Sequence, residues 1–137
     1  MFCKYHSRVY CKLMKKFITA VVAVLMATTA QAHEWTPTYP KFEPSFLDGI
    51  VVTSMTLFNK RKDIEYYEIS VYDKDWNTVP FASTMKLINV SYLGQKSVDI
   101  YIREADCDRI EYICTTSKRI LEDTQSSGID SRICSKV

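Results

Sequence analysis

Two runs near the middle of the chain alternate apolar and polar residues with a period of two. Residues 98–103 are Val-Asp-Ile-Tyr-Ile-Arg, and residues 109–114 are Arg-Ile-Glu-Tyr-Ile-Cys. Successive side chains of a β-strand point to opposite faces, so each run predicts a strand with one face toward a core. The residues expected to face inward are Val98, Ile100, Ile102, Ile110, Tyr112 and Cys114. Because such half-apolar strands need a second layer to cover them, the sequence predicts stacked β-sheets.

Further strands are expected before these two runs. Residues 50–58 are mostly β-branched and apolar, and residues 65–73 place Tyr67, Ile69 and Val71 in one phase. A short edge piece is expected at 78–81, and a strand with a bulge at 85–93. The total is six to seven strands and no long amphipathic helix. We therefore predict an all-β fold, a single immunoglobulin-like antiparallel β-sandwich.

The N-terminal segment has the pattern of a signal peptide. Lys15 and Lys16 precede an apolar run over residues 17–27, and Ala30-Gln31-Ala32 is a small-x-small cleavage site. Met14 opens a complete signal by itself, so the true start is possible at either methionine. The apolar run is shorter than the about 20 residues that span a bilayer. We expect a mature chain that starts at His33, carries no membrane anchor, and is periplasmic or secreted.

Charge argues against a nucleic-acid partner. Residues 1–32 hold five of the 18 lysines and arginines and none of the 16 acidic residues, so residues 33–137 have a net charge of −3. Proteins that bind nucleic acid present clustered basic residues, and the only short basic run here, residues 60–62, is expected in a solvated turn.

Composition divides the chain into four parts. They are a signal peptide (residues 1–32), a proline- and aromatic-rich extended arm (33–46), the β-sandwich (47–122) and a polar C-terminal tail (123–137), expected to be loose. The arm contains Trp35, Tyr39 and Phe42, which we expect to pack on the domain. The alternative is an arm that binds a partner.

Three cysteines remain after the expected cleavage: Cys107, Cys114 and Cys134. Disulfides form in exported proteins, and three pairings are open: 107–114, 107–134 and 114–134. We favour a disulfide between Cys107 and Cys114, because the short loop between them brings them together often. Three free thiols remain the alternative.

The sequence after the expected cleavage site contains few residues that could carry out catalysis. Nucleophilic catalysis usually needs a histidine base, and His33 is the one histidine after the signal. Asp73 with Asp75, and Asp106 with Asp108, are paired carboxylates in predicted turns, where acids are expected anyway. We therefore predict a non-enzymatic protein without cofactors. His33 is a candidate copper ligand, but a copper site needs a second histidine.

Five segments carry a family resemblance. They are residues 56–59, 67–73, 80–81, 93–100 and 108–109. Over about residues 50–118 they resemble the N-terminal domain of periplasmic pilus-assembly chaperones. This resemblance implies an immunoglobulin-like fold, export, and the lending of an edge strand to a partner protein. The basic pair that anchors the subunit in that family has no counterpart here. Asp108-x-Ile-x-Tyr-x-Cys114 also resembles the corner before the sixth strand of immunoglobulin domains.

The favoured function is therefore an exported module that binds another exported protein, in a chaperone-like manner by edge-strand addition. Tyrosine and tryptophan are common at interfaces, so the candidate contacts are Tyr66, Tyr72, Tyr101 and Trp35. The alternatives are a structural surface or appendage subunit, and a small copper-binding exported protein.

Overall fold

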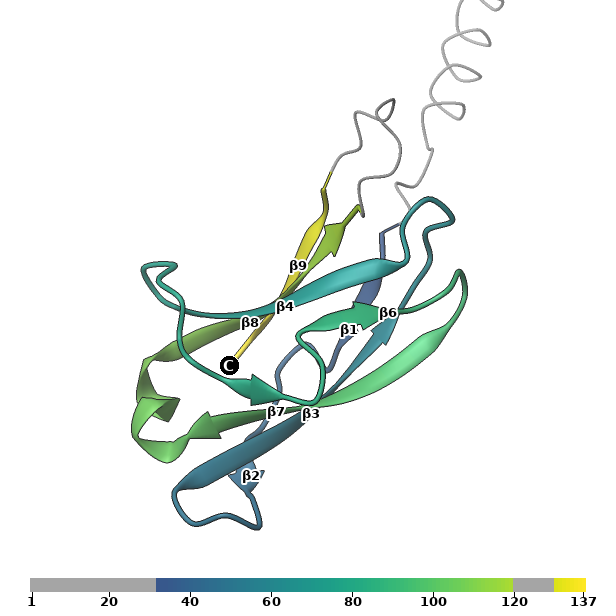
Figure 1. Cartoon of the computed structure of the whole chain (residues 1–137). Coiled ribbons are helices and arrows are strands. Elements are labelled where there is room, and N and C mark those ends of the chain that lie inside the picture. The colour runs from purple at the N-terminus through teal and green to yellow at the C-terminus, as the bar shows by residue number, and fades with distance from the viewer. Residues whose placement is uncertain (1–31, 120–129) are drawn as a thin grey trace, which may run out of the picture. The chain divides into compact units, whose positions relative to one another are not determined.

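The computed structural model describes residues 32–119 and 130–137, and in this part of the chain the strands form two antiparallel sheets (Figure 1). Sheet A has the order β1-β3-β7-β5, and β2 also pairs with β3. Its strands are β1 (Glu34–Thr36), β2 (Glu43–Pro44), β3 (Ile50–Phe58), β5 (Ala82–Ser83) and β7 (Gln95–Arg103). Sheet B has the order β6-β4-β8-β9. Its strands are β4 (Tyr66–Asp73), β6 (Leu87–Asn89), β8 (Ile110–Lys118) and β9 (Arg132–Lys136).

This arrangement confirms the predicted immunoglobulin-like sandwich. Early strands pair with β7 in one sheet, and β4 pairs with β8 in the other, as in that fold. The described residues hold nine strands rather than six to seven, because β1, β2 and β9 were not predicted. The edge piece expected at 78–81 forms instead at β5, and the strand expected at 85–93 is reduced to β6. A 3₁₀-helix, η1 (Glu104–Arg109), carries the chain from β7 to β8. The signal peptide and the boundary at residue 122 lie outside the described residues.

The inward faces of β7 and β4 follow the predicted alternation, and the inward residues of β3 pair with those of β7. Met55 lies opposite Val98 and Thr53 opposite Ile100 in sheet A, and all four are buried. In sheet B the inward side chains of β4 are those expected from the sequence. The buried apolar core includes Met55, Leu57, Tyr67, Ile69, Val71, Ile88, Val90, Val98, Ile100, Ile102, Ile110 and Ile113.

The predicted phase of β8 is wrong. The register shifts where Tyr72 faces Tyr112 and Asp73 faces Ile110, so Glu111 is an extra residue on β8. Such a bulge reverses the alternation. Ile110 and Ile113 are therefore both buried, whereas Tyr112 is only half-buried and lies on the outer face of sheet B. The immunoglobulin-like corner expected at Tyr112 is replaced by this bulge.

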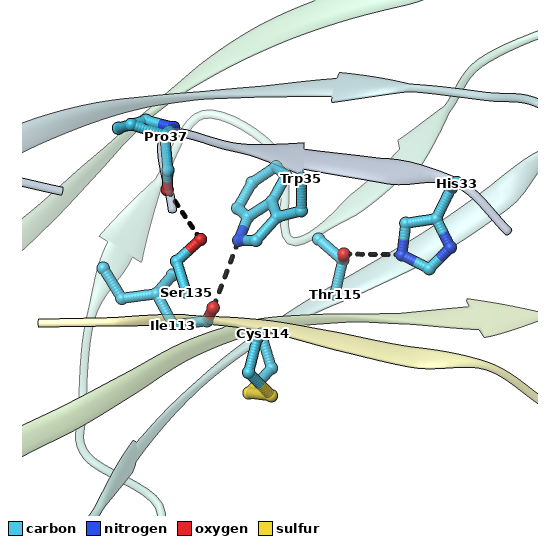
Figure 2. The surroundings of a disulfide bond; sticks show 8 residues. His33, Trp35, Pro37, Ile113, Cys114, Thr115 and Ser135 are labelled. Carbon is cyan, nitrogen blue, oxygen red and sulfur yellow. Dashed lines mark hydrogen bonds between the residues drawn. A yellow bond between two sulfur atoms is a disulfide. The ribbon is translucent and has the colours of Figure 1, made fainter. Parts of the chain in front are cut away.

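The N-terminal arm closes one side of the sandwich. β1 pairs with β3, and the indole N–H of Trp35 donates to the carbonyl of Ile113 at 3.1 Å (Figure 2). Ser135 Oγ donates to the carbonyl of Pro37 at 2.7 Å, and the N–H of Lys136 donates to that of Thr38 at 3.0 Å. The arm therefore contacts both sheets. The prediction that its aromatics pack on the domain is confirmed for Trp35 and Phe42 and is wrong for Tyr39, which is 73% exposed.

Two predictions about the C-terminal region are wrong. Residues 132–136, expected in a loose tail, form β9 and pair with β8. Cys134 lies opposite Cys114 with a Cα–Cα distance of 4.0 Å, and these two residues form the disulfide (Figure 2). Cys107 is a free thiol on η1. The expected pairing of Cys107 with Cys114 does not form, because Cys114 is bonded to its partner across the two strands.

Asn59, the residue directly after β3, is buried and is a hub of hydrogen bonds. Its side-chain amide donates to the carbonyls of Ile64 and Val90, both at 2.8 Å. Its Oδ1 accepts from the backbone N–H of Arg61 at 2.8 Å and from the hydroxyl of Tyr67 at 2.5 Å. All four hydrogen-bonding positions of this amide are filled, which fixes the loop between β3 and β4 against the core.

Candidate interaction surface

Two exposed large apolar side chains lie in the loop between β2 and β3. Phe46 is 84% exposed and Leu47 is 52% exposed. The loop is fixed by hydrogen bonds from the N–H of Ser45 to Ile50 and of Ile50 to Leu47, at 3.0 and 3.2 Å. Gly49 has φ of +74°, a left-handed conformation that suits glycine. The turn therefore holds both apolar side chains in solvent.

These side chains form one wall of a groove of about 430 Å³ at one end of sheet A. The remaining lining comes from the start of β3, from β7, and from the segment that leads into β5. The lining residues are Phe46, Leu47, Ile50, Pro80, Phe81, Ala82, Tyr101 and Arg103. Seven of these eight are apolar or aromatic. The ring of Phe46 stands edge-on to that of Tyr101, with centroids 6.4 Å apart.

Arg103 is the one charged residue in this lining, and it is held by a buried carboxylate. Its guanidinium lies 2.6 Å from Asp106, and Arg109 lies 3.0 Å from the other oxygen of the same carboxylate. The hydrogen bond from Arg103, followed by the charges of the two arginines, lowers the pKa of Asp106 below its ordinary value. The same 3₁₀-helix also carries Glu104 and Asp108, so charges of both signs lie at this end of the groove.

The four aromatic residues expected to contact a partner lie in three different parts of the structure. Tyr101 lines the groove. Tyr66 and Tyr72 lie on β4 in sheet B, with their side chains half-buried. Trp35 is 4% exposed and belongs to the core, so its assignment as a contact residue is wrong. Phe46 and Leu47 were missed, because a loop gives no periodic signal that separates exposed apolar residues from buried ones.

His33, the candidate copper ligand, lies in the interior with both ring nitrogens next to hydroxyl groups. Its side chain is buried, Nε2 lies 2.8 Å from Thr115 Oγ1, and Nδ1 lies 3.4 Å from Ser131 Oγ (Figure 2 shows the Thr115 contact). Burial lowers the pKa of His33 to about 4. Among the described residues no three or more His, Cys, Asp or Glu side chains are grouped to hold a metal ion.

The paired acids have structural contacts. Asp73 Oδ1 accepts the N–H groups of Asp75 and Asn77, and Asp106 binds the two arginines described above. In the described part of the chain, no helix is long and apolar enough to span a membrane.

The fold and these contacts define an immunoglobulin-like β-sandwich with an apolar groove on one sheet. No protein-family model matches the sequence, and no curated protein matches it.

Proposed function

We propose that this chain is a non-enzymatic, exported protein-binding module that holds an apolar segment of another exported protein in the groove. The observation that supports the proposal most is the exposure of Phe46 and Leu47 beside Tyr101. Burying one such side chain stabilises a complex by about 1.5–3 kcal/mol. A contiguous group of exposed apolar residues is typical of an interaction site.

Edge-strand addition would place the partner segment beside β5. β5 is the edge strand of sheet A and pairs with only Tyr101 and Ile100 of β7. A partner strand added beside β5 would direct every second side chain over the outer face of the sheet, where the groove lies. Backbone hydrogen bonds would then supply affinity, and the groove would select apolar side chains.

Capture of the partner tests the proposal. The purified protein is incubated with envelope and culture-fluid proteins of the cells that produce it. We expect the wild-type chain to retain a protein that the variant Phe46→Asp loses. Phe46 is exposed, so this change leaves the fold intact, which the thermal unfolding midpoint checks.

Tyr39→Asp is the matched control. Tyr39 is a 73% exposed aromatic residue outside the groove lining, so its variant should retain the partner. Equal capture by wild type and Phe46→Asp would show that the groove is not the binding site.

A further inference from the structure

A second aromatic site lies on sheet B, in the turn after β4. Asp73 Oδ1 accepts the N–H of Asp75 at 2.8 Å and of Asn77 at 2.9 Å, and the N–H of Trp76 donates to the Asp73 carbonyl at 3.1 Å. Trp76 has φ of +64°. This left-handed conformation favours glycine or asparagine, and non-glycine residues in it cluster at functional sites. The turn thus forces a bulky aromatic residue into a costly conformation.

The indole of Trp76 is a rigid, open plate. It stacks on the ring of Tyr112 with centroids 4.5 Å apart and an interplanar angle of 7°, and Tyr72 lies beside it at 5.5 Å. Trp76 is nevertheless 49% exposed. Since Tyr112 covers one face of the indole, the opposite face is the one open to solvent. Stacking and the hydrogen-bonded turn together fix the orientation of this face.

We propose that the open face of Trp76 binds a pyranose ring of a neutral or acidic saccharide. The faces of aromatic rings carry partial negative charge, which attracts the polarised C–H groups on one face of a sugar. The sugar hydroxyls lie around the ring edge and need polar partners. Lys74 and Asp75, which pair with each other at 3.7 Å and are both largely exposed, precede Trp76 in the same turn and supply a donor and an acceptor.

Charged groups of both signs lie around the Trp76 indole. Arg132 lies over the ring of Tyr72, 5.4 Å from its centroid, and the ion pairs of the described residues do not include Arg132. Lys136, opposite Tyr112, is paired with Glu111 at 3.2 Å. The turn itself adds two carboxylates, so donors and acceptors for sugar hydroxyls are both present around the indole.

Tryptophan fluorescence gives a direct test, because the sequence has two tryptophans and the other, Trp35, is buried. The probes are hexamers of glucose, of N-acetylglucosamine and of galacturonic acid, with polyproline and oligoarginine peptides as competing ligand classes. We expect a saturable blue shift of the Trp76 emission with at least one saccharide in the millimolar range. Both variants lack this fluorophore, so their binding is measured by isothermal titration calorimetry: Trp76→Ala should abolish it and Trp76→Phe should retain part of it.

Phe46→Asp separates this proposal from the proposed function, since it alters the groove and should leave saccharide binding unchanged. If Trp76→Ala fails to fold, the indole N–H resonance of Trp76 in the wild-type protein is followed by NMR during the same titrations. Absence of any saccharide response at Trp76 would overturn the proposal. A response there to polyproline or oligoarginine alone would overturn it as well.

Discussion

At the scale of single residues, the imidazole of His33 joins the N-terminal arm to β8 and to the segment before β9. Its neighbours are the hydroxyls of Thr115 and Ser131 and the ring of Tyr67, whose centroid is 4.5 Å away. The nearby charge is the guanidinium of Arg61, which also lowers the pKa of His33. No carboxylate acts to raise that pKa, so protonation places a buried cation near another cation.

Stability is therefore expected to fall as the pH falls from 6.5 to about 4. The folded pKa of about 4 lies below the ordinary value of 6.5, so the unfolded chain binds more protons in this window. The loss is at most roughly 3 kcal/mol, given about 1.4 kcal/mol per pKa unit. Urea unfolding at a series of pH values measures it. His33→Gln, which does not titrate, should flatten the slope in this window; an unchanged slope would contradict the assignment.

Asn59 is expected to be the costliest polar residue to replace. Asn59→Ala leaves the carbonyls of Ile64 and Val90 and the hydroxyl of Tyr67 without their partner, at about 1–3 kcal/mol for each buried group. We expect a loss of several kcal/mol in the free energy of unfolding. Tyr67→Phe removes one of these bonds and should cost about 1 kcal/mol. Equal effects of the two substitutions in urea unfolding would show that Asn59 is not a hub.

Residue type alone predicted some of these roles and not others. Tyr67, Ile69 and Val71 alternate in a strand, so their burial follows from periodicity. Asn59 precedes a basic, polar run and is expected in a solvated turn. Its side chain instead donates hydrogen bonds to backbone carbonyls of two separate segments. That role depends on Ile64 and Val90 meeting in space, which no local pattern encodes.

At the scale of elements, the disulfide holds β9 against β8. Its two cysteines are separated by 20 residues, and closing a loop of that size stabilises a protein by about 3 kcal/mol. We expect Cys134→Ser to lower the free energy of unfolding by that order, whereas Cys107→Ser should leave it almost unchanged. Denaturant unfolding under non-reducing conditions makes the comparison.

Peptide mapping checks the pairing itself. Alkylation of the native protein should label Cys107, and digestion should release a peptide that links Cys114 to Cys134. A linked peptide that contains Cys107 would contradict the structure.

Some of these strands could be predicted from the sequence and others could not. β3 has the bounds expected from its β-branched run, because a continuous apolar strand is a strong local signal. β9 has the sequence Arg-Ile-Cys-Ser-Lys, which is too short and polar to stand out, and its strand state depends on pairing with β8. The phase of β8 was missed because one extra residue, Glu111, reverses it, and bulges have no firm sequence signature.

At the scale of the whole molecule, the two sheets offer different surfaces. Sheet A has the apolar groove beside its short edge strand β5, and sheet B has the Trp76 plate beside a positive charge. The sequence predicted the sandwich, and Tyr101, one of the predicted contact residues, lines the groove. It did not predict the groove, because the groove forms only where the loop after β2, the segment before β5 and the end of β7 meet.

Amide hydrogen exchange of the protein with its captured partner shows whether the partner binds in the groove. We expect the backbone amides of residues 46–50, 81–82 and 101–103 to exchange more slowly in the complex, and those of β8 and β9 to exchange at an unchanged rate. Protection confined to β8 and β9, or none at the groove, would contradict it.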